Sequence, residues 1–308
     1  MKLRIGTRGS ELALAQTRTV SQQLLHAHPD LMLEEVILKP AGDVDRSTPL
    51  KSQGSVGLFT KELERALLAE EIDVAVHSLK DLPTQLPEGL ELAAIPKRES
   101  PWDVWISEEV PGLVDLPEGA RVATGSPRRR AQILHSFPHL KVVGIRGNID
   151  TRLASYPKHA AGLVLAAAGL VRIGRQQAIR AFFGPTEMTP APGQGALGLE
   201  VRADHNSARE LLASLTHRPT QSAVTGERIL LSRLEGGCSL PIGALGQVRG
   251  DRLALLGMIA DHDGKRLLRL SVEGSAADPE ALGVDLAEKL RRAGGDEILR
   301  DLRPKESG

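Results

Sequence analysis

The sequence predicts an α/β protein with two α/β domains and a small α+β domain at its C-terminal end. Three observations support this fold class. Short apolar runs alternate with amphipathic segments from the N-terminus onward. Two Pro-containing stretches, residues 96–102 and 190–195, interrupt that alternation. After residue 220 the pattern changes to a helix, three consecutive strands and another helix.

The first domain is expected to begin with strands and helices in βαβα order. The expected strands are residues 3–7, 33–38 and 73–78. Ser10 is expected to cap a helix over residues 11–26, and Thr60 is expected to cap a helix over residues 61–70. The strands are continuously apolar, which is typical of a largely parallel sheet that is covered on both faces.

A second α/β pattern lies between the two Pro-containing stretches. Its expected strands are residues 103–106, 122–124, 141–145 and 163–166, and its expected helices are residues 127–135 and 148–153. Residues 92–95 form an expected strand before the first stretch, and residues 197–201 form a strand that returns to the first domain. Two crossings make a double crossover hinge between two periplasmic-binding-protein-like domains, as in clamshell binding proteins.

The third domain is expected to contain a helix from residue 220 to about residue 234, strands near 244–248, 253–259 and 267–272, and a helix over 279–292. We therefore divide the chain into three domains. They are residues 1–98 with 197–217, residues 103–192, and residues 220–308. We detect no internal sequence repeat, and we expect the polar tail over 303–308 to be frayed.

Composition argues against several functional classes. The 308 residues carry 39 basic and 39 acidic side chains, and this zero net charge argues against a general nucleic-acid binder. The chain contains no run of 18 apolar residues, so no membrane span is predicted. The N-terminal segment enters a strand without a signal-peptide pattern, so we expect a cytoplasmic protein. No long apolar helix face is left over, so we expect a monomer.

Cys238 is the one cysteine of the chain, so an internal disulfide is impossible. A lone cysteine commonly serves as a small apolar core residue. Gly236, Gly237 and Pro241 favour an exposed turn, where a thiol can act as a nucleophile or as a covalent attachment point. The local context leaves the structural and the reactive interpretation equally open.

Arginines cluster where strands of the second domain are expected to end. The chain has 28 Arg and 11 Lys, and a GC-rich genome explains the overall excess but not the clustering. The clustered residues are Arg128, Arg129, Arg130, Arg146, Arg152 and Arg172. Three cations at a helix start repel one another unless a negative group neutralises them. Ligands of open α/β sheets bind at this edge, so we expect a pocket for a ligand with several carboxylates or phosphates.

Two strand ends of the first domain carry further candidates. Arg8 and Ser10 lie between the first strand and the first helix, where they are placed to hold an anion. Lys80 and Asp81 follow the apolar strand over 73–78, and Asp81 could stabilise a developing cation or exchange protons. Each group could instead be a solvated surface residue. No phosphate-binding loop, dinucleotide fingerprint or metal-binding pair is present, so no metal is expected.

Taken in order, these segments resemble the porphobilinogen deaminase family over almost the full chain. The matching segments are RGS at residues 8–10, GLFTKELE at 57–64, VHSLKDLP at 76–83, GSPRR at 125–129, RGN at 146–148, TRL at 151–153, AGL at 168–170, GQGA at 193–196 and LEGGC at 234–238. Their combined order and spacing are much more specific than any one of them.

The resemblance implies a transferase that joins four porphobilinogen molecules head to tail, releases ammonia and forms hydroxymethylbilane, a precursor of haem. It implies a dipyrromethane cofactor that is held by Cys238 through a thioether, with Asp81 as the catalytic residue. The other implied cofactor-binding residues are Lys80, Ser126, Arg128, Arg129 and Arg152. The implied substrate-binding residues are Arg8, Ser10, Arg146 and Arg172.

The chain departs from the family pattern at Val56, where a lysine is usual, and at Ala161 and Gly162, where Asp-Ala is usual. On the residues alone, two other classes stay open. One is a non-catalytic clamshell module for a polyanionic ligand, which would have no need of the Gly-Gly-Cys segment. The other is a hydrolase with a cysteine nucleophile, for which His217 or His262 would be the partner.

Overall fold

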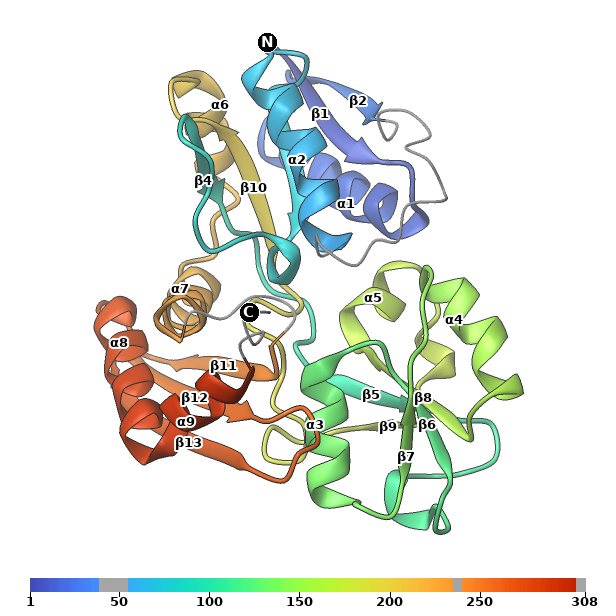
Figure 1. The fold of residues 1–308 in the computed structure, drawn as a ribbon. Helices are drawn as coiled ribbons and strands as arrows, with labels where there is room; N and C mark the ends of the chain where they lie inside the picture. Colours follow the sequence, from blue (N-terminus) through green and yellow to red (C-terminus); the bar gives the residue numbers. More distant parts are fainter. Residues whose placement is uncertain (39–54, 235–239, 303–308) are drawn as a thin grey trace, which may run out of the picture. The chain divides into compact units, whose positions relative to one another are not determined.

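The computed structural model describes residues 1–38, 55–234 and 240–302. The chain divides into two compact units, Met1–Glu99 with Ala196–Gln221, and Ser100–Gly195 with Ser222–Gly308. The described residues form one sheet in the first unit and two sheets in the second (Figure 1). The predicted fold class, two α/β parts and a small α+β part at the C-terminal end, is confirmed. The division into three domains stays a prediction.

The first unit is built on a five-stranded sheet with the order β2-β1-β3-β10-β4. Its strands are β1 (Lys2–Arg8), β2 (Met32–Leu38), β3 (Val74–Ser78), β4 (Leu90–Ala94) and β10 (Leu197–Arg202). β1 pairs in parallel with β2 and β3, whereas β10 is antiparallel to β3 and β4. The sheet is therefore mixed: β1, β2, β3 and β4 run in one direction, as the expectation of a largely parallel sheet requires, and β10 alone runs against them. The returning strand β10 arrives without the helical crossover that a parallel neighbour requires.

Two helices cover opposite faces of this sheet. α1 (Glu11–Ala27) packs Val20 and Leu24 against Val74 and Val76 of β3, and α2 (Ser55–Leu68) packs Leu63 and Leu67 against Ala75. Successive residues of β3 thus face different helices, as the pleat requires. Thr60 lies inside α2, so its predicted capping role is wrong; the apolar spacing of the sequence continues ahead of it. The helix α6 (Asn206–Ala213) was not predicted.

The second unit contains a sheet with the order β7-β6-β8-β5-β9. Its strands are β5 (Asp103–Ile106), β6 (Arg121–Ala123), β7 (Lys141–Val143), β8 (Gly162–Ala166) and β9 (Ala181–Phe182). β6 pairs in parallel with β7 and β8, whereas β5 is antiparallel to β8 and β9. This arrangement repeats that of the first sheet strand for strand. The repeat lies in the topology and not in the residues, which explains why the sequence did not reveal it.

The helices of this part are α3 (Pro127–Ser136), α4 (Ile149–Ser155) and α5 (Ala167–Arg172). Trp105 of β5 is fully buried and packs with Ile133 of α3 and Val164 of β8. Gly162 makes room for it, because a Cβ atom at Gly162 would lie 2.1 Å from Cη2 of Trp105. The glycine that replaces the usual alanine is therefore required by the local packing.

The described residues of the C-terminal part form an antiparallel sheet and three α-helices. The strands β11 (Ile242–Arg249), β12 (Arg252–Ala260) and β13 (Leu267–Ser275) pair in sequence order. Residues of α7 (Arg218–Arg233), α8 (Pro279–Leu290) and α9 (Asp296–Leu302) share one apolar cluster with this sheet. The helix predicted over 279–292 corresponds to α8, and α9 was not predicted. Gly294, with a φ of 109°, breaks the helical path between them.

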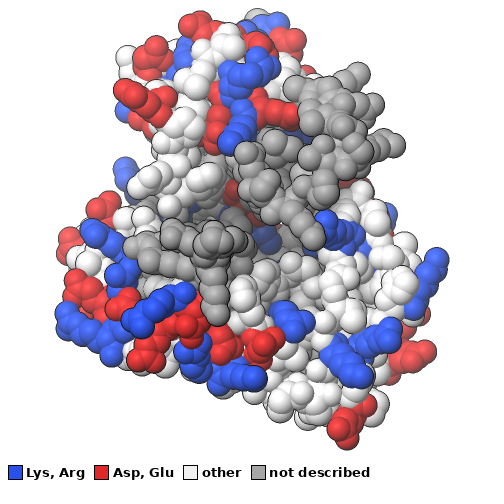
Figure 2. Space-filling model, in the orientation of Figure 1, with Lys and Arg blue, Asp and Glu red and all other residues white. Residues whose placement is uncertain are grey.

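The surface of the described residues mixes both signs of charge. In the face drawn in Figure 2, basic and acidic side chains are interspersed. Exposed arginines form ion pairs with nearby carboxylates, such as Arg252 with Glu273 at 3.1 Å and Arg292 with Glu288 at 2.8 Å. Such exposed pairs contribute roughly 0–1 kcal/mol each, so part of the arginine excess is ordinary surface charge. Within the described ranges, no helix is long and apolar enough to cross a membrane.

Candidate active site

In the first unit, the predicted residues lie at the carboxyl ends of two adjacent strands. Arg8 is the last residue of β1, and Lys80 and Asp81 form the short helix η1 (Leu79–Asp81) directly after β3. Because β1 and β3 are parallel neighbours, both ends reach the same edge of the sheet. Asp81 is exposed, and Lys80 and Arg8 are partly buried. The topology therefore brings an acid and two cations to one edge.

Electrostatic coupling connects Arg8 with Asp81. Burial lowers the pKa of Arg8, and the carboxylates of Asp81 and Glu62 oppose that shift. The Asp81 carboxylate is therefore close enough to the Arg8 guanidinium for the two charges to interact. A carboxylate at this edge can stabilise a positive charge that develops on a ligand.

Ser10 and Ser78 fix the helix α1 against this edge. Ser10 is the N-cap of α1, and its hydroxyl oxygen accepts a hydrogen bond from the backbone N–H of Ala13 at 3.3 Å. The predicted cap is thereby confirmed. One turn further on, the side-chain amide of Gln16 donates to Oγ of Ser78 at 2.7 Å. This bond ties α1 to the last residue of β3, three residues before Asp81.

In the second unit, the predicted arginines follow three neighbouring strand ends. β7, β6 and β8 are parallel neighbours, so their carboxyl ends share one edge. Ser126, Arg128 and Arg129 begin α3 after β6, and Arg146 follows β7. Arg172 ends α5, which follows β8. The edge is therefore basic.

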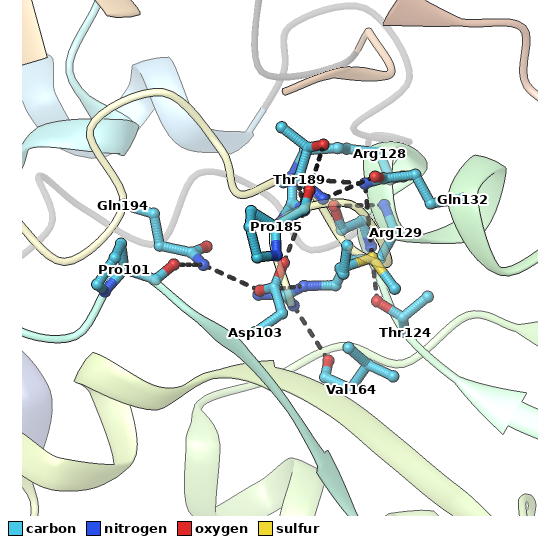
Figure 3. A network of polar contacts seen from close by, with 12 residues as sticks. Pro101, Asp103, Thr124, Arg128, Arg129, Gln132, Val164, Pro185, Thr189 and Gln194 are labelled. Carbon is cyan, nitrogen blue, oxygen red and sulfur yellow. Dashed lines mark hydrogen bonds and ion pairs between the residues drawn. The ribbon is translucent and has the colours of Figure 1, made fainter. Parts of the chain in front are cut away.

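Arg128 and Arg129 turn inward onto a carboxylate that the sequence analysis had not singled out (Figure 3). Nη1 of Arg128 donates to Oδ2 of Asp103 at 2.7 Å. Nε of Arg129 donates to Oδ1 of Asp103 at 2.9 Å, and its Nη2 lies 2.7 Å from the same oxygen. Asp103 is fully buried, and the two arginines are 4% and 5% exposed. The negative group that the arginine cluster requires is thus supplied partly by the protein itself.

The electrostatics of Asp103 follow from this geometry. Burial alone would raise the pKa of Asp103, but the guanidiniums of Arg128 and Arg129 outweigh burial and lower it to about 2. The side-chain amide of Gln194 adds a hydrogen bond to Oδ1 at 3.0 Å. Asp103 is therefore ionised at neutral pH. Two cations and one anion leave the cluster with a net charge of +1 at the start of α3, where the helix dipole also favours an anion.

A second layer of hydrogen bonds orients Arg128. Its Nη1 also donates to the backbone carbonyl of Thr189 at 2.6 Å. Gln132 holds Thr189 from both sides, since it donates to the same carbonyl at 3.2 Å and accepts from the N–H of Thr189 at 2.7 Å. Arg269 of β13 donates to Oγ1 of Thr189 at 3.0 Å and to Oε1 of Gln132 at 3.2 Å. The C-terminal sheet thus supports the arginine pair.

The third arginine of the run has a different role. Arg130 points away from Asp103 and lies 3.3 Å from Oδ1 of Asp263, in the turn between β12 and β13. In the same turn, the carbonyl of Gly264 is 2.8 Å from Nδ1 of His135 of α3. Gly264 has a φ of 69° and packs against the carbonyl of Ala131. This contact joins α3 to the C-terminal sheet.

The remaining arginines are held less tightly. Arg146 is exposed. Arg152 donates from Nε to the carbonyl of Gly147 at 2.7 Å, which keeps it beside the Arg146 loop. Arg172 donates from Nη2 to the carbonyl of Gly195 at 2.7 Å. Their partly exposed positions suit recognition of a ligand more than support of a core.

The predicted cysteine site lies partly outside the described residues. Cys238 is not among them, so its pairing with His217 or His262 stays a prediction. Sequence reasoning also missed Asp103, Gln132 and Gln194. A charged residue that opens the apolar strand of residues 103–106 was the one available signal for Asp103, because a buried charge requires a partner.

Fold and site together define a class: a duplicated α/β fold with a basic edge in one unit and an acid beside cations in the other. Comparison with known proteins identifies the family. Residues 3–210 match the family model described as porphobilinogen deaminase, dipyromethane cofactor binding domain, and residues 222–292 match porphobilinogen deaminase, C-terminal domain. The chain belongs to the porphobilinogen deaminase family, and the resemblance predicted from its motifs is confirmed.

Curated relatives match along their whole length. The chain is 46% identical to a porphobilinogen deaminase of Trichlorobacter lovleyi over 306 residues, which cover 99% of this chain and 98% of that protein. It is 47% identical to one of Pelotomaculum thermopropionicum over 306 residues, with the same shares covered. It is 46% identical to one of Thermus thermophilus over 301 residues, which cover 97% of this chain and 98% of that protein.

Among solved structures, similar chains include a periplasmic substrate-binding protein of an ABC transporter from Coxiella burnetii. It is 16% identical, with a TM-score of 0.44, and the match covers 73% of this chain and 96% of that one. A nutrient-binding protein from Burkholderia cenocepacia is 15% identical, with a TM-score of 0.42, and the match covers 68% of this chain and 89% of that one.

Proposed function

We propose that this chain joins four porphobilinogen molecules head to tail, with loss of ammonia at each addition, and forms hydroxymethylbilane. Family membership supports this reaction. The observation that carries the assignment of residues is the position of Asp81. It lies in η1 at the carboxyl edge of the first sheet, exposed and coupled to Arg8.

Asp81 would act on the aminomethyl pyrrole of the substrate. When ammonia leaves, positive charge develops on the pyrrole nitrogen, and an ionised carboxylate next to it lowers the energy of that state. The same carboxylate would then assist removal of the proton from the pyrrole carbon after the new C–C bond has formed.

The basic groups of the second unit suit a dipyrromethane cofactor, whose carboxylates require cationic donors. Arg128 retains donors for such a ligand, because its Nε and Nη2 make no hydrogen bond within the described part of the chain. Ser126, Arg129 and Arg152 would complete the set in this unit, and the family resemblance implies Lys80 as a further cofactor-binding residue. When bound, the cofactor supplies the pyrrole carbon to which the first substrate molecule is joined.

Substrate handling would fall to the other predicted residues. Arg8, Ser10, Arg146 and Arg172 would bind the acetate and propionate groups of porphobilinogen and of the growing chain. Cys238 would hold the cofactor through a thioether, and a reducing cytoplasm would keep its thiol available for that attachment. We further propose that the protein is cytoplasmic and that it is a monomer. A measurement of molar mass by light scattering would test the monomer.

The variant Asp81→Asn tests the catalytic assignment. It keeps the size of the side chain and removes the charge, so we expect ammonia release from porphobilinogen to fall by roughly 10²–10⁴-fold. The exposed Asp115 of the second unit offers a control of equal charge change, and Asp115→Asn should retain full activity. An Asp81→Asn enzyme with wild-type turnover would remove Asp81 from the mechanism.

A further inference from the structure

One arginine of the C-terminal sheet faces helix α3. Arg269 lies in β13, and successive residues of a strand point to opposite faces of its sheet. Leu268 and Leu270 pack into the apolar cluster that contains α8 and α9, whereas Leu267 packs against Ala131 of α3. The pleat therefore places Arg269 on the α3 side of the sheet.

On this side Arg269 has two hydrogen-bond acceptors. Its Nε donates to Oγ1 of Thr189 at 3.0 Å, and its Nη2 donates to Oε1 of Gln132 at 3.2 Å. The described residues give it no carboxylate as an ion-pair partner, and partial burial lowers its pKa. A partly buried cation without a counterion costs free energy, so an apolar side chain would serve packing alone better than Arg269 does.

The two acceptors belong to one buried hydrogen-bond motif (Figure 3). Oε1 of Gln132 accepts from the N–H of Thr189 at 2.7 Å. Nε2 of Gln132 donates to the carbonyl of Thr189 at 3.2 Å and to the carbonyl of Arg128 at 3.3 Å. Because a guanidinium is only a donor, Arg269 can face the oxygen of the Gln132 amide but not its nitrogen. Arg269 therefore stabilises the amide orientation in which Nε2 reaches both carbonyls.

This motif holds the acceptor that orients Arg128. Of the two hydrogens on Nη1 of Arg128, one meets the carbonyl of Thr189 at 2.6 Å and the other meets Oδ2 of Asp103 at 2.7 Å. Two acceptors on one nitrogen fix the plane of the guanidinium. Nε and Nη2 then form a fork on another edge of the same plane, and such a fork binds a carboxylate through two parallel hydrogen bonds.

We propose that Arg269 is a positioning residue, which holds Gln132 and Thr189 and thereby aims the Nε–Nη2 fork of Arg128 at a carboxylate of the cofactor. This inference rests on the proposed function, in which Arg128 binds the dipyrromethane cofactor. β11 of the same sheet begins shortly after Cys238 in the sequence. The C-terminal part of the chain would thus both attach the cofactor and aim a group that binds its carboxylates.

The first test measures the motion of Arg128 itself. The order parameter of its Nε–H group is obtained from nitrogen-15 relaxation in the full chain with Cys238→Ser, which the proposed function leaves without cofactor. Arg269→Met keeps a long side chain and removes the donors, so the order parameter of Arg128 should fall by about 30%, the difference between a rigid and a flexible group. An unchanged order parameter would overturn the proposal.

Two control variants separate positioning from general loosening. Arg249→Met removes the same charge at the exposed end of β11 and should leave the order parameter of Arg128 unchanged. Gly264→Ala strains the contact of this sheet with α3 at a different point, because its Cβ would meet the backbone of Ala131. A loss of order in either control as large as that in Arg269→Met would show that Arg269 has no specific role.

The second test follows attachment of the cofactor. Chains that retain Cys238 are produced in cells that make no porphobilinogen and are then incubated with porphobilinogen, while intact mass records the gain of two linked pyrroles. Counted per folded chain, Arg269→Met should gain this mass at least about fivefold more slowly than the wild type. Arg249→Met should match the wild type. Equal rates in Arg269→Met and the wild type would contradict the aiming of the Arg128 fork.

The two tests fail separately. If the wild type gained no mass from porphobilinogen, the proposed function would fail. The order parameters would still decide whether Arg269 holds Arg128 in place, because that measurement uses neither substrate nor cofactor.

Discussion

Asp103 balances two buried arginines, and the variant Asp103→Asn measures how much the fold depends on that balance. Asparagine keeps the volume of the side chain but leaves Arg128 and Arg129 buried without a counterion. Removal of one partner from a buried ion pair costs about 3–5 kcal/mol. The pKa shift gives a lower figure, because a change from 3.8 to about 2 corresponds to about 2.4 kcal/mol at 1.36 kcal/mol per unit. We expect the free energy of unfolding of Asp103→Asn to be about 3–5 kcal/mol lower than that of the wild type.

The assay is urea unfolding at pH 7, followed by tryptophan fluorescence. Both tryptophans of the chain, Trp102 and Trp105, lie in the second unit with Asp103, so the signal reports on the relevant part. With a slope of about 2 kcal/mol per molar urea, the midpoint should fall by about 1.5–2.5 M. Asp115→Asn, which changes the charge equally at an exposed position of the same unit, should stay within about 0.5 kcal/mol of the wild type.

The pH dependence has a definite sign. Folding lowers the pKa of Asp103, so its contribution is fully present above the ordinary value of 3.8 and is lost as pH falls toward 2. The stability difference between wild type and Asp103→Asn should therefore be constant near neutrality and should shrink in acid. A loss below about 1 kcal/mol at pH 7, or a difference that does not depend on pH, would refute the electrostatic account of the arginine pair.

Two further predictions concern the second unit. In Gly264→Ala the new Cβ would lie 2.1 Å from the carbonyl oxygen of Ala131, whereas in Gly250→Ala it would meet no atom within 4 Å, although both glycines have positive φ. Backbone strain should lower the free energy of unfolding of both variants, measured in urea, by about 1–2 kcal/mol. The clash should lower that of Gly264→Ala by about 1–3 kcal/mol more. Equal losses in the two variants would contradict the contact of α3 with the C-terminal sheet. Arg146→Gln should leave stability within about 0.5 kcal/mol, since Arg146 is exposed, and should raise KM for porphobilinogen in a steady-state assay. An unchanged KM would exclude Arg146 from substrate binding.

Local signals in the sequence predicted much of the fold. The strand over residues 103–106 coincides with β5, and the start of α3 at Pro127 follows from a Ser-Pro cap. The antiparallel placement of β10 was not predicted, because an apolar run does not reveal the direction in which a strand enters a sheet. Thr60 was misassigned because a threonine within a helix has the same sequence appearance as a cap.

The site was predictable in its charges but not in its internal contacts. The motifs and the family resemblance placed arginines at the strand ends, and the parallel strands bring those ends to one edge. The inward turn of Arg128 and Arg129 depends on Asp103, which precedes them by 25 and 26 residues. No local periodicity encodes such a pairing. The contact of His77 with Glu200 likewise joins two distant segments, so only the folded chain reveals it.

The measurement that tests the central claim most directly is the intact mass of the purified protein beside a Cys238→Ser variant. The account predicts that the wild type carries additional mass equal to two linked pyrroles, and that the variant carries none. If the wild type is isolated without the addition, incubation with porphobilinogen should add it. A wild-type chain that stays unmodified after that incubation, or a Cys238→Ser chain that carries the same addition, would contradict the account.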